Sequence, residues 1–501
     1  MEKYSIHPNP LVKFLKKEPK DFTKADLVNF IVANGIEMVN FRYAAADGRL
    51  KTLNFIINDL NYLDTILTYG ERVDGSSLFP NFVQAGASDL YVVPRYRTAF
   101  VNPFSEIPTL DILCGYYDKD GQPFASAPDQ ALHRAHNEFK KLTGMEFHAM
   151  GELEYYVVSE ADDLYVTPDQ RGYHESGPFC KWGDMRREAM KAIAEAGGKI
   201  KYGHSEVGNF AVDGLMYEQN EIEFLPVDVE EAADQLLIAK WILREMAYRY
   251  GVNLTFAPKI TVGKAGSGMH IHTKVVKDGQ NMYLADGKLT DVAKTVIAGI
   301  LDAADALTAF GNTNPTSYLR LVPHQEAPTN ICWGDRNRSV LVRVPLGWTT
   351  GAGEMIKNAN PTEQGEVLPP KDKQTVEFRC PDGSADVYLL LAGLVAAARH
   401  GFEMENAVEY AEERYVGVNI FEEEHKAVAE RLAHLPDSCA MSADALEAKR
   451  AIFESKGVFS ASLIDGWAKM LRAHNDANLR EELAANPELI KELVAKFLNV
   501  G

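Results

Sequence analysis

The feature that most constrains this fold is a set of apolar strands that carry charged or imidazole side chains at alternate positions. The first is MGELEYYVVS at residues 150–159, where Glu152 and Glu154 alternate with apolar residues. Successive side chains of a strand point to opposite faces, so both glutamates lie on one face. Two carboxylates there repel each other unless a cation lies between them. Taken alone, this pair fits a solvated edge strand and a functional site equally well.

The same spacing returns in later segments, at Glu221/Glu223, His270/His272, Arg336/Arg338 and Glu377/Arg379. One such strand indicates a solvated edge. Several in one domain predict a curved sheet with a polar concave face and an apolar convex face that packs under helices. A concave face that holds both carboxylates and arginines predicts a binding or catalytic site, because such charges must be paired when they are buried.

The side chains on this face favour particular chemistry. Sets of carboxylates with one or two imidazoles suit Mg²⁺ or Mn²⁺ rather than structural zinc. Two such ions would offset the clustered negative charge and bind a polyphosphate, and nearby arginines would bind phosphate or carboxylate. The chain has no GxxxxGK[ST] loop, and GKAGSGMH fits neither that motif nor GxGxxG. We therefore expect phosphoryl transfer with a nucleotide bound by metal and arginine.

Composition indicates which classes of partner and which cellular compartment fit this chain. The chain has 501 residues, enough for two or three domains, and a net charge of −19, which argues against a nucleic-acid partner. Its five cysteines are scattered and form no CxxC pair, which is typical of a reduced cytosolic protein. We find no signal-peptide core and no apolar stretch long enough for a membrane span. These patterns predict a cytoplasmic protein that binds no membrane.

Local patterns predict a small β-rich domain followed by a larger mixed one. A capped helix at 22–35 begins with Thr23 and Asp26, and two strand-like runs follow around the turn at Asp47-Gly48. Further helices are expected near 128–144, 184–197, 229–250, 290–310 and 385–400. Strands are expected at 146–158, 218–225, 253–261, 268–276, 338–344 and 374–380, with a hairpin at 276–285. This order favours α+β with a mostly antiparallel sheet.

From about residue 30 to 400, the ordered motifs resemble type I glutamine synthetase. The two longest matches are VDGSSLFPNFVQAGASDLYVVP (73–94) and APKITVGKAGSGMHIH (257–272). The other motifs are GELEYY, GY at 172–173, HSEV, EQNEIEF, SYLRLVPHQEAP, WGDRNRSVLVRVP and VEFRCPD. The resemblance implies a β-grasp-like N-terminal domain with a leading helix (1–120). It also implies a catalytic domain on a curved antiparallel sheet flanked by helices (121–501).

The resemblance also implies ATP and two divalent ions, Mg²⁺ or Mn²⁺, in each site. The residues that match the ligands of one ion are Glu154, Glu206 and Glu221. Those that match the ligands of the other ion, beside the ATP phosphates, are Glu152, His270 and Glu377. On this interpretation, the two glutamates of the first strand face two different ions.

Substrate contacts are implied in the same way. Glutamate would be bound by Arg320 and Arg379, with Gly266 in the substrate-binding stretch. The transferring phosphate would be bound by Arg338 and Arg343, with His272 beside them in the ATP site.

The ammonium site matches residues from two subunits. Asp74 and Ser77 would come from a neighbouring subunit, and Asp74 would deprotonate ammonium. Tyr173 and Glu326 match the remaining ammonium contacts, with Glu326 on a loop that closes over the intermediate. The turn-forming sequence DGSS also allows Asp74 to be only a turn cap.

The implied reaction joins ammonia to the γ-carboxylate of L-glutamate through γ-glutamyl phosphate, in a dodecamer of two stacked rings. Ala265 replaces an asparagine that often contacts substrate, and this favours as an alternative a γ-glutamyl ligase for a larger amine. A third possibility is a non-catalytic member of the family. The nearly complete ligand set argues against it, because unused clustered carboxylates would be destabilising.

Several positions depart from the family pattern. The segment VGNFAVDG lengthens the spacing between Glu206 and Glu221, and we expect it to form a longer loop. A second insertion spans 346–375, where the usual basic phosphate contacts near 371–375 are changed and Lys357, Lys371 or Lys373 are the candidate substitutes. The family's adenylylated tyrosine is replaced by Phe421, so we predict no adenylylation. Glu223 matches no ligand and is expected to be solvated or paired.

Overall fold

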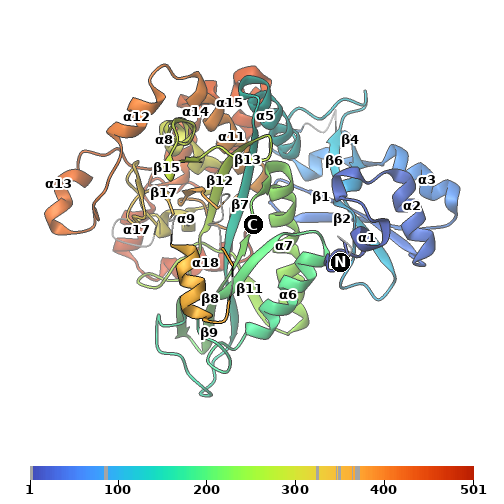
Figure 1. The fold of residues 1–501 in the computed structure, drawn as a ribbon, viewed down its shortest axis with the longest axis horizontal. Helices are drawn as coiled ribbons and strands as arrows, with labels where there is room; N and C mark the ends of the chain where they lie inside the picture. The colour runs from blue at the N-terminus through green and yellow to red at the C-terminus, as the bar shows by residue number, and fades with distance from the viewer. Residues whose placement is uncertain are drawn as a thin grey trace.

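The chain folds into two parts, each organised by one sheet (Figure 1). The structure is a computed structural model, and it describes residues 4–83, 88–322, 327–345, 347, 351–363, 365–366 and 373–501. The N-terminal part holds the smaller sheet, and the larger sheet lies at the centre of the remaining chain.

The N-terminal sheet has the strand order β2-β1-β6-β4-β3, with β5 paired to β6. The parallel pairing of β1 with β6 is flanked by antiparallel neighbours, as in a β-grasp fold. Thr23 and Asp26 form the predicted capping box of α2. The strands are β1 (Met38–Ala44), β2 (Leu50–Ile56), β3 (Glu71–Asp74), β4 (Asp89–Pro94), β5 (Phe100–Val101) and β6 (Thr109–Tyr117). The helices are α1 (Pro10–Leu15), α2 (Lys24–Ala33), α3 (Leu60–Tyr69) and α4 (Gly75–Leu78).

The large sheet has the order β16-β17-β18-β12-β7-β9-β8, and all its pairings are antiparallel except that of β16 with β17. Its long strands are β7 (Glu146–Glu160), β8 (Ile200–Val212), β9 (Leu215–Phe224) and β12 (Met269–Lys277). Its short strands are β10 (Val227–Asp228), β11 (Asn253–Thr255), β13 (Gln280–Asn281), β16 (Trp333–Asp335), β17 (Val342–Val344) and β18 (Val376–Phe378). A separate two-stranded ribbon pairs β14 (Leu284–Ala285) with β15 (Lys288–Leu289).

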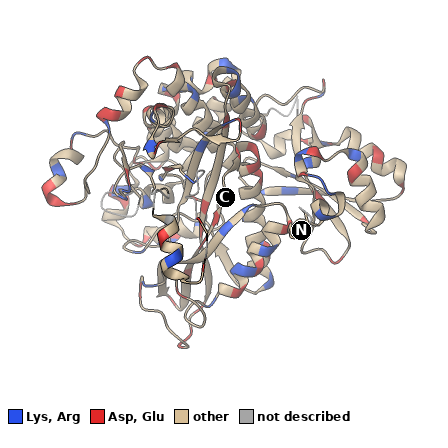
Figure 2. Cartoon of the chain, viewed as in Figure 1, with Lys and Arg blue, Asp and Glu red and all other residues tan. Residues whose placement is uncertain are grey.

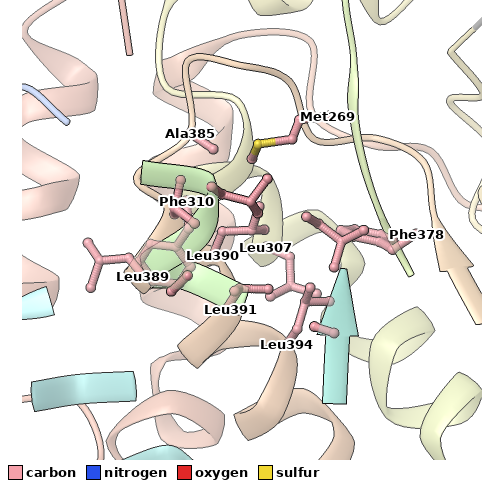
Figure 3. Packing of buried hydrophobic residues seen from close by; sticks show 14 of the residues in the cluster. Met269, Leu307, Phe310, Phe378, Ala385, Leu389, Leu390, Leu391 and Leu394 are labelled. Carbon is pink, nitrogen blue, oxygen red and sulfur yellow. The ribbon is translucent and has the colours of Figure 1, made fainter. Parts of the chain in front are cut away.

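Helices α5, α7, α8 and α11 pack in one core with the apolar face of this sheet. The helices of this part are α5 (Pro128–Thr143), α6 (Gly183–Glu195), α7 (Val229–Arg249), α8 (Asp291–Gly311), α9 (Pro315–Arg320), α10 (Ala352–Ala359), α11 (Val387–Glu403), α12 (Ala407–Glu413), α13 (Lys426–Ala429), α14 (Cys439–Ala448), α15 (Arg450–Glu454), α16 (Ala461–Arg472), α17 (Leu479–Ala485) and α18 (Leu489–Phe497). Figure 3 shows Met269 and Phe378 from the sheet beside Leu307 and Phe310 of α8 and Leu390 of α11. All five are buried. This packing confirms the predicted α+β fold and fixes the opposite face of β12 and β18 as the polar one.

Several strands differ from the sequence prediction. The segment that we expected to be a longer loop instead forms part of β8, which pairs with β9 around a two-residue turn at Asp213-Gly214. Both turn residues have positive φ, 51° and 78°, as tight hairpin turns require. The strand expected at 253–261 ends at Thr255, just before the proline at 258. The strand expected at 338–344 begins only at Val342, because Asn337 turns the chain by accepting the backbone N–H of Ser339.

A buried polar contact joins the two parts. Arg95, just after β4, donates two hydrogen bonds to Asp234 of α7, at 2.8 and 3.1 Å. The Tyr388 hydroxyl of α11 donates to the same carboxylate at 2.7 Å. Arg42 of β1 also lies over the ring of Trp241 on α7, 4.3 Å from its centroid. These contacts fix the orientation of the N-terminal part against the large sheet.

Among the described helices, none alone is long and apolar enough to cross a membrane. One pair, Val387–Glu403 with Ala407–Glu413, passes that test jointly by length and composition only, although it is bent by 110°.

Candidate active site

A cavity of about 1640 Å³ opens over the polar face of the large sheet. Its walls come from β7, β8, β9, β12, β17 and β18 and from the loops beside them. The sequence-predicted residues that line it are Glu152, Glu154, Tyr173, Glu206, Glu221, Gly266, His270, His272, Arg320, Arg338, Arg343, Glu377 and Arg379. The fold therefore brings together residues that are separated by more than two hundred positions in the chain.

Strand register arranges these side chains in rows across the sheet. In the first row, His204 of β8 lies opposite Glu221 of β9, which lies opposite Glu154 of β7. In the second row, Glu223 lies opposite Glu152, which lies opposite His270. In the third row, His272 lies opposite Glu377, which lies opposite Arg343. Each row has a carboxylate at its centre and an imidazole at one end. Acidic positions lie on these central strands as well as on the outer helices (Figure 2).

Glu152, His270 and Glu377 form a potential ion site, with one ligand atom from each within 4.8 Å of the others. His270 Nδ1 lies 3.0 Å from a Glu152 oxygen and 3.5 Å from a Glu377 oxygen. Burial, with help from the nearby Arg379, lowers the pKa of His270, so its imidazole is neutral. Burial alone would raise the pKa of Glu152, but His272 and His270 hold it well below its usual range. A neutral imidazole beside an ionised carboxylate is the donor set that a divalent ion needs.

The second predicted ligand set is arranged differently. Glu154 accepts the backbone N–H of Gly268 at 2.8 Å, and Glu206 accepts that of Val207 at 2.6 Å. Both line the cavity, but the compact group around Glu221 contains His204 and Glu223 instead. Burial raises the pKa of Glu221 well above its usual range, and the surrounding carboxylates of Glu152, Glu154, Glu206 and Glu223 add to this effect.

His204 was not among the predicted site residues. Its only sequence signal was its position in HSEV, two residues before Glu206. The unexpected strand β8 places it opposite Glu221. Glu223 was expected to be either solvated or paired, and it is paired. It accepts hydrogen bonds from Lys201 at 2.6 Å and from the Tyr202 hydroxyl.

Arginines lie next to the carboxylate and imidazole ligands in the same cavity. Arg343 and Arg379 both donate to Glu377, at 2.9 and 3.0 Å. Arg320 donates to the backbone carbonyl of Cys380 at 2.8 Å and has a second nitrogen 3.4 Å from His270 Nε2. Arg338 lines the same cavity. These guanidinium groups can bind carboxylate or phosphate oxygens next to the ion ligands.

His272 differs from its neighbour two residues earlier. Burial would lower its pKa, but Glu152 outweighs that effect and raises it. Its Nε2 lies 2.8 Å from Glu152, and its Nδ1 lies 2.8 Å from the Thr375 hydroxyl. The raised pKa favours the cationic form of His272, whereas the lowered pKa of His270 favours a neutral ligand.

The glycines of GSGMHIH make room for this arrangement. A Cβ on Gly268 would lie 2.5 Å from an Arg320 nitrogen and 3.0 Å from His270 Nε2. A Cβ on Gly266 would lie 2.7 Å from the Pro258 carbonyl oxygen and 3.0 Å from Arg320 Cγ. Any side chain at either position would displace the arginine or the histidine. These glycines are required by close approach, not by a nucleotide-binding loop.

Two predicted ammonium contacts lie outside this cavity. Asp74 ends β3 and caps α4, accepting the Ser76 N–H at 2.9 Å and the Ser77 hydroxyl at 2.6 Å. These hydrogen bonds lower the pKa of Asp74 to about 2. Neither Asp74 nor Ser77 lines the cavity. Their placement satisfies the turn-cap interpretation, and a catalytic role would require a neighbouring subunit. Glu326 and part of the 346–375 insertion lie outside the described residues.

One wall of the cavity is aromatic. Tyr173 is half-exposed and stacks on His174, with ring centroids 4.1 Å apart. The centroid of the His204 ring lies 4.3 Å from that of His174 and 5.8 Å from that of Tyr202. This wall stands beside the carboxylates of the first row. It offers π faces and negative charge to a cationic ligand.

Comparisons with known proteins identify the family of this chain. Two family models match: "Glutamine synthetase, beta-Grasp domain" at residues 35–119 and "Glutamine synthetase, catalytic domain" at residues 125–486. The chain is 29% identical to the glutamine synthetase of Methanococcus maripaludis, covering 86% of this chain and 91% of that protein. It is 33% identical to that of Thermococcus kodakarensis, covering 79% and 81%.

Two solved structures share the fold. A GmaS/ADP complex has a TM-score of 0.73 at 20% identity, covering 92% of this chain and 99% of that chain. A Plasmodium falciparum glutamine synthetase determined by electron cryomicroscopy has a TM-score of 0.73 at 21% identity, covering 93% and 98%. At such identities the likeness concerns the fold alone.

Proposed function

This chain belongs to the glutamine synthetase family, and on that premise we propose that it joins ammonia to the γ-carboxylate of L-glutamate with ATP. The family uses ATP and divalent metals, and its matches support ligase activity. The observation that carries the proposal is the register of the large sheet. It sets ion-ligating carboxylates and imidazoles directly beside arginines in one cavity.

The residues divide into two ion sites and two anion sites. Glu152, His270 and Glu377 fit one divalent ion, and Glu221 with its neighbouring carboxylates fits the other. When bound, such ions neutralise phosphate oxygens. Arg320 and Arg379 would orient the glutamate substrate, and Arg338 and Arg343 would hold the transferring phosphoryl group.

The reaction proceeds in two steps. A γ-carboxylate oxygen of glutamate bonds to the γ-phosphorus of ATP, and the bond to ADP breaks. The amine nitrogen then bonds to the acyl carbon, phosphate leaves, and the nitrogen loses a proton. Arginines and His272 hold the negative charge that accumulates between two anions in the first step. The acyl phosphate must be shielded from water until the amine arrives.

A specific observation favours a larger amine as the second candidate. The aromatic wall of Tyr173, His174 and Tyr202 offers more apolar surface than ammonium needs. Ala265, where family members often carry asparagine, leaves room beside Gly266. Both features fit an alkylammonium group whose charge faces the carboxylates.

One assay separates the candidates. Phosphate release from ATP with Mg²⁺ and L-glutamate is measured with ammonium and with a panel of primary amines and diamines, and the product mass is determined. Ammonium-dependent release with glutamine formed supports the first proposal, and Asp74→Ala should then abolish it. Release only with another amine identifies the second. No release with any amine would contradict both and favour a non-catalytic protein.

We also propose that the protein assembles as the dodecamer expected for this family, so that Asp74 reaches a neighbouring cavity. The expected particle mass is about twelve times 55.6 kDa. Light scattering after size-exclusion chromatography measures it directly. A monomer that retains ammonium-dependent activity would contradict this arrangement.

A further inference from the structure

The group at Glu221 includes an imidazole that the family resemblance did not assign to metal binding. One ligand atom each from His204, Glu221 and Glu223 lies within 4.8 Å of the others. His204 Nε2 lies 3.3 Å from a Glu221 oxygen. The His204 and Glu221 side chains are 13% and 7% exposed, so this contact is largely shielded from water.

The orientation of the His204 ring is fixed from outside the group. Its Nδ1 lies 3.0 Å from the backbone carbonyl oxygen of Ser205. A carbonyl oxygen only accepts hydrogen bonds, so Nδ1 must carry the proton. In a neutral ring, Nε2 then presents its lone pair to the Glu221 carboxylate. A lone pair facing a carboxylate at 3.3 Å is repulsive unless a cation lies between them.

The cation can be a proton or a metal ion. Metal-bound histidines commonly donate their other ring N–H to a backbone carbonyl, as His204 does. Glu221 is also surrounded by the carboxylates of Glu152, Glu154 and Glu206, and a single proton would offset little of their charge. A divalent ion would offset more of it.

We propose that His204 supplies an imidazole nitrogen to the divalent ion at Glu221. Each of the two ions would then have one imidazole ligand, His270 at one and His204 at the other. The inference rests on the proposed function only in placing a divalent ion at Glu221. A nitrogen ligand suits Mn²⁺ better than Mg²⁺, which prefers oxygen ligands. The Glu221 site should therefore bind Mn²⁺ more tightly than Mg²⁺.

Binding of Mn²⁺ to the metal-free full-length protein tests this without turnover. Free Mn²⁺ is followed by its EPR signal during titration of wild type, His204→Ala, His204→Gln and His174→Ala. The wild type should bind two ions per chain. Both His204 variants should bind one of the two ions at least about tenfold to a hundredfold more weakly. Loss of a group that only supports a metal ligand already costs that much affinity. His174→Ala is the matched control, because the His174 ring contacts that of His204, with 4.3 Å between the centroids, but His174 is not in the ligand group.

Pulsed EPR identifies the nitrogen directly. In His270→Ala, which lacks the other imidazole, bound Mn²⁺ should still show ¹⁴N coupling, and the coupling should vanish when His204→Ala is added. Unchanged affinity in both His204 variants, equal weakening in His174→Ala, or persistent coupling in the double variant would each overturn the proposal. A protein that shows the His204 dependence but ligates no amine would overturn the proposed function alone.

Discussion

The contact between the two domains and the active-site cavity both bury charge, but they balance it in opposite ways. At the domain contact, the Asp234 carboxylate receives two hydrogen bonds from Arg95 and one from Tyr388. The Asp234 carboxylate and the Arg95 guanidinium are thus paired within the chain. In the cavity, Glu221 is surrounded by four other glutamates, and burial raises its pKa well above the usual range.

The difference separates structural charge from functional charge. A buried ion pair whose hydrogen bonds are made within the protein orients its elements, and it breaks at a cost when one partner is removed. A buried cluster of like charges destabilises the folded chain until ligands balance it. The cavity therefore trades stability for the ability to hold cations and anions.

The largest expected effect comes from Glu221→Gln, which removes one of the clustered carboxylates. We expect ligase activity to fall about 10³-fold, as when a strong electrostatic contact to the transition state is lost. The metal-free protein should become more stable, because a carboxylate flanked by four others is gone. Phosphate-release assays and denaturant unfolding in EDTA measure the two effects. Glu160→Gln, at the exposed end of β7, should change neither. Lower metal-free stability in Glu221→Gln would contradict the interpretation.

Removing one partner at the domain contact should lower stability and leave activity unchanged, the reverse of what we expect for Glu221→Gln. Asp234→Ala leaves Arg95 buried without its carboxylate, and we expect a loss of about 3–5 kcal/mol in unfolding free energy. Activity per folded molecule should persist at low temperature. The double variant Arg95→Met/Asp234→Leu should recover much of the stability, since it removes both charges. Thermal unfolding of the three proteins tests this, and a fully stable single variant would refute it.

The pH dependence of stability should reveal Asp129, which lies beside the domain contact on α5. Burial, with Asp234 nearby, raises its pKa to about 6 despite Arg95. The folded state thus binds a proton that the unfolded state releases near pH 4, and this contribution to stability is lost as the pH rises from about 4 to about 6. The difference corresponds to about 3 kcal/mol.

Asp129→Asn should remove that dependence. Unfolding of wild type and variant is compared at pH values from 4 to 7. The wild type should lose stability relative to the variant across this range, and parallel curves would show that Asp129 titrates normally.

The smallest expected effect, counted per ion site, is stabilisation by divalent ions. Mn²⁺ at a hundredfold excess over its dissociation constant should add about 2.7 kcal/mol per site to the folded state. The gain should persist in Asp234→Ala and shrink in Glu221→Gln, because only the second variant changes the ion ligands. Thermal unfolding with and without Mn²⁺ measures this gain in stability. An equal gain in both variants would contradict the distinction between the domain contact and the ion-binding cavity.

Sequence patterns predicted much of the fold and part of the site, namely the features that depend on residues close together in the chain. The capping box of α2 and the hairpin between β12 and β13 depend on neighbouring residues, and both form as predicted. The strand β8 was missed because its glycines and polar residues have weak strand preference, and pairing with β9 stabilises it. The Asp213-Gly214 turn was the available signal for that hairpin. His204 was missed for the same reason, since its role depends on a partner strand.

What the sequence determined by itself is which side chains share a face. Alternation along a strand is a property of the backbone, so the pattern of Glu152 with Glu154 and of His270 with His272 required no knowledge of the partners. What only the tertiary structure decided is which of these side chains meet. Register placed His204 opposite Glu221 and Glu377 opposite Arg343, and the packing of the two domains left Asp74 outside the cavity. Such choices depend on long-range pairing and packing, which no local pattern encodes.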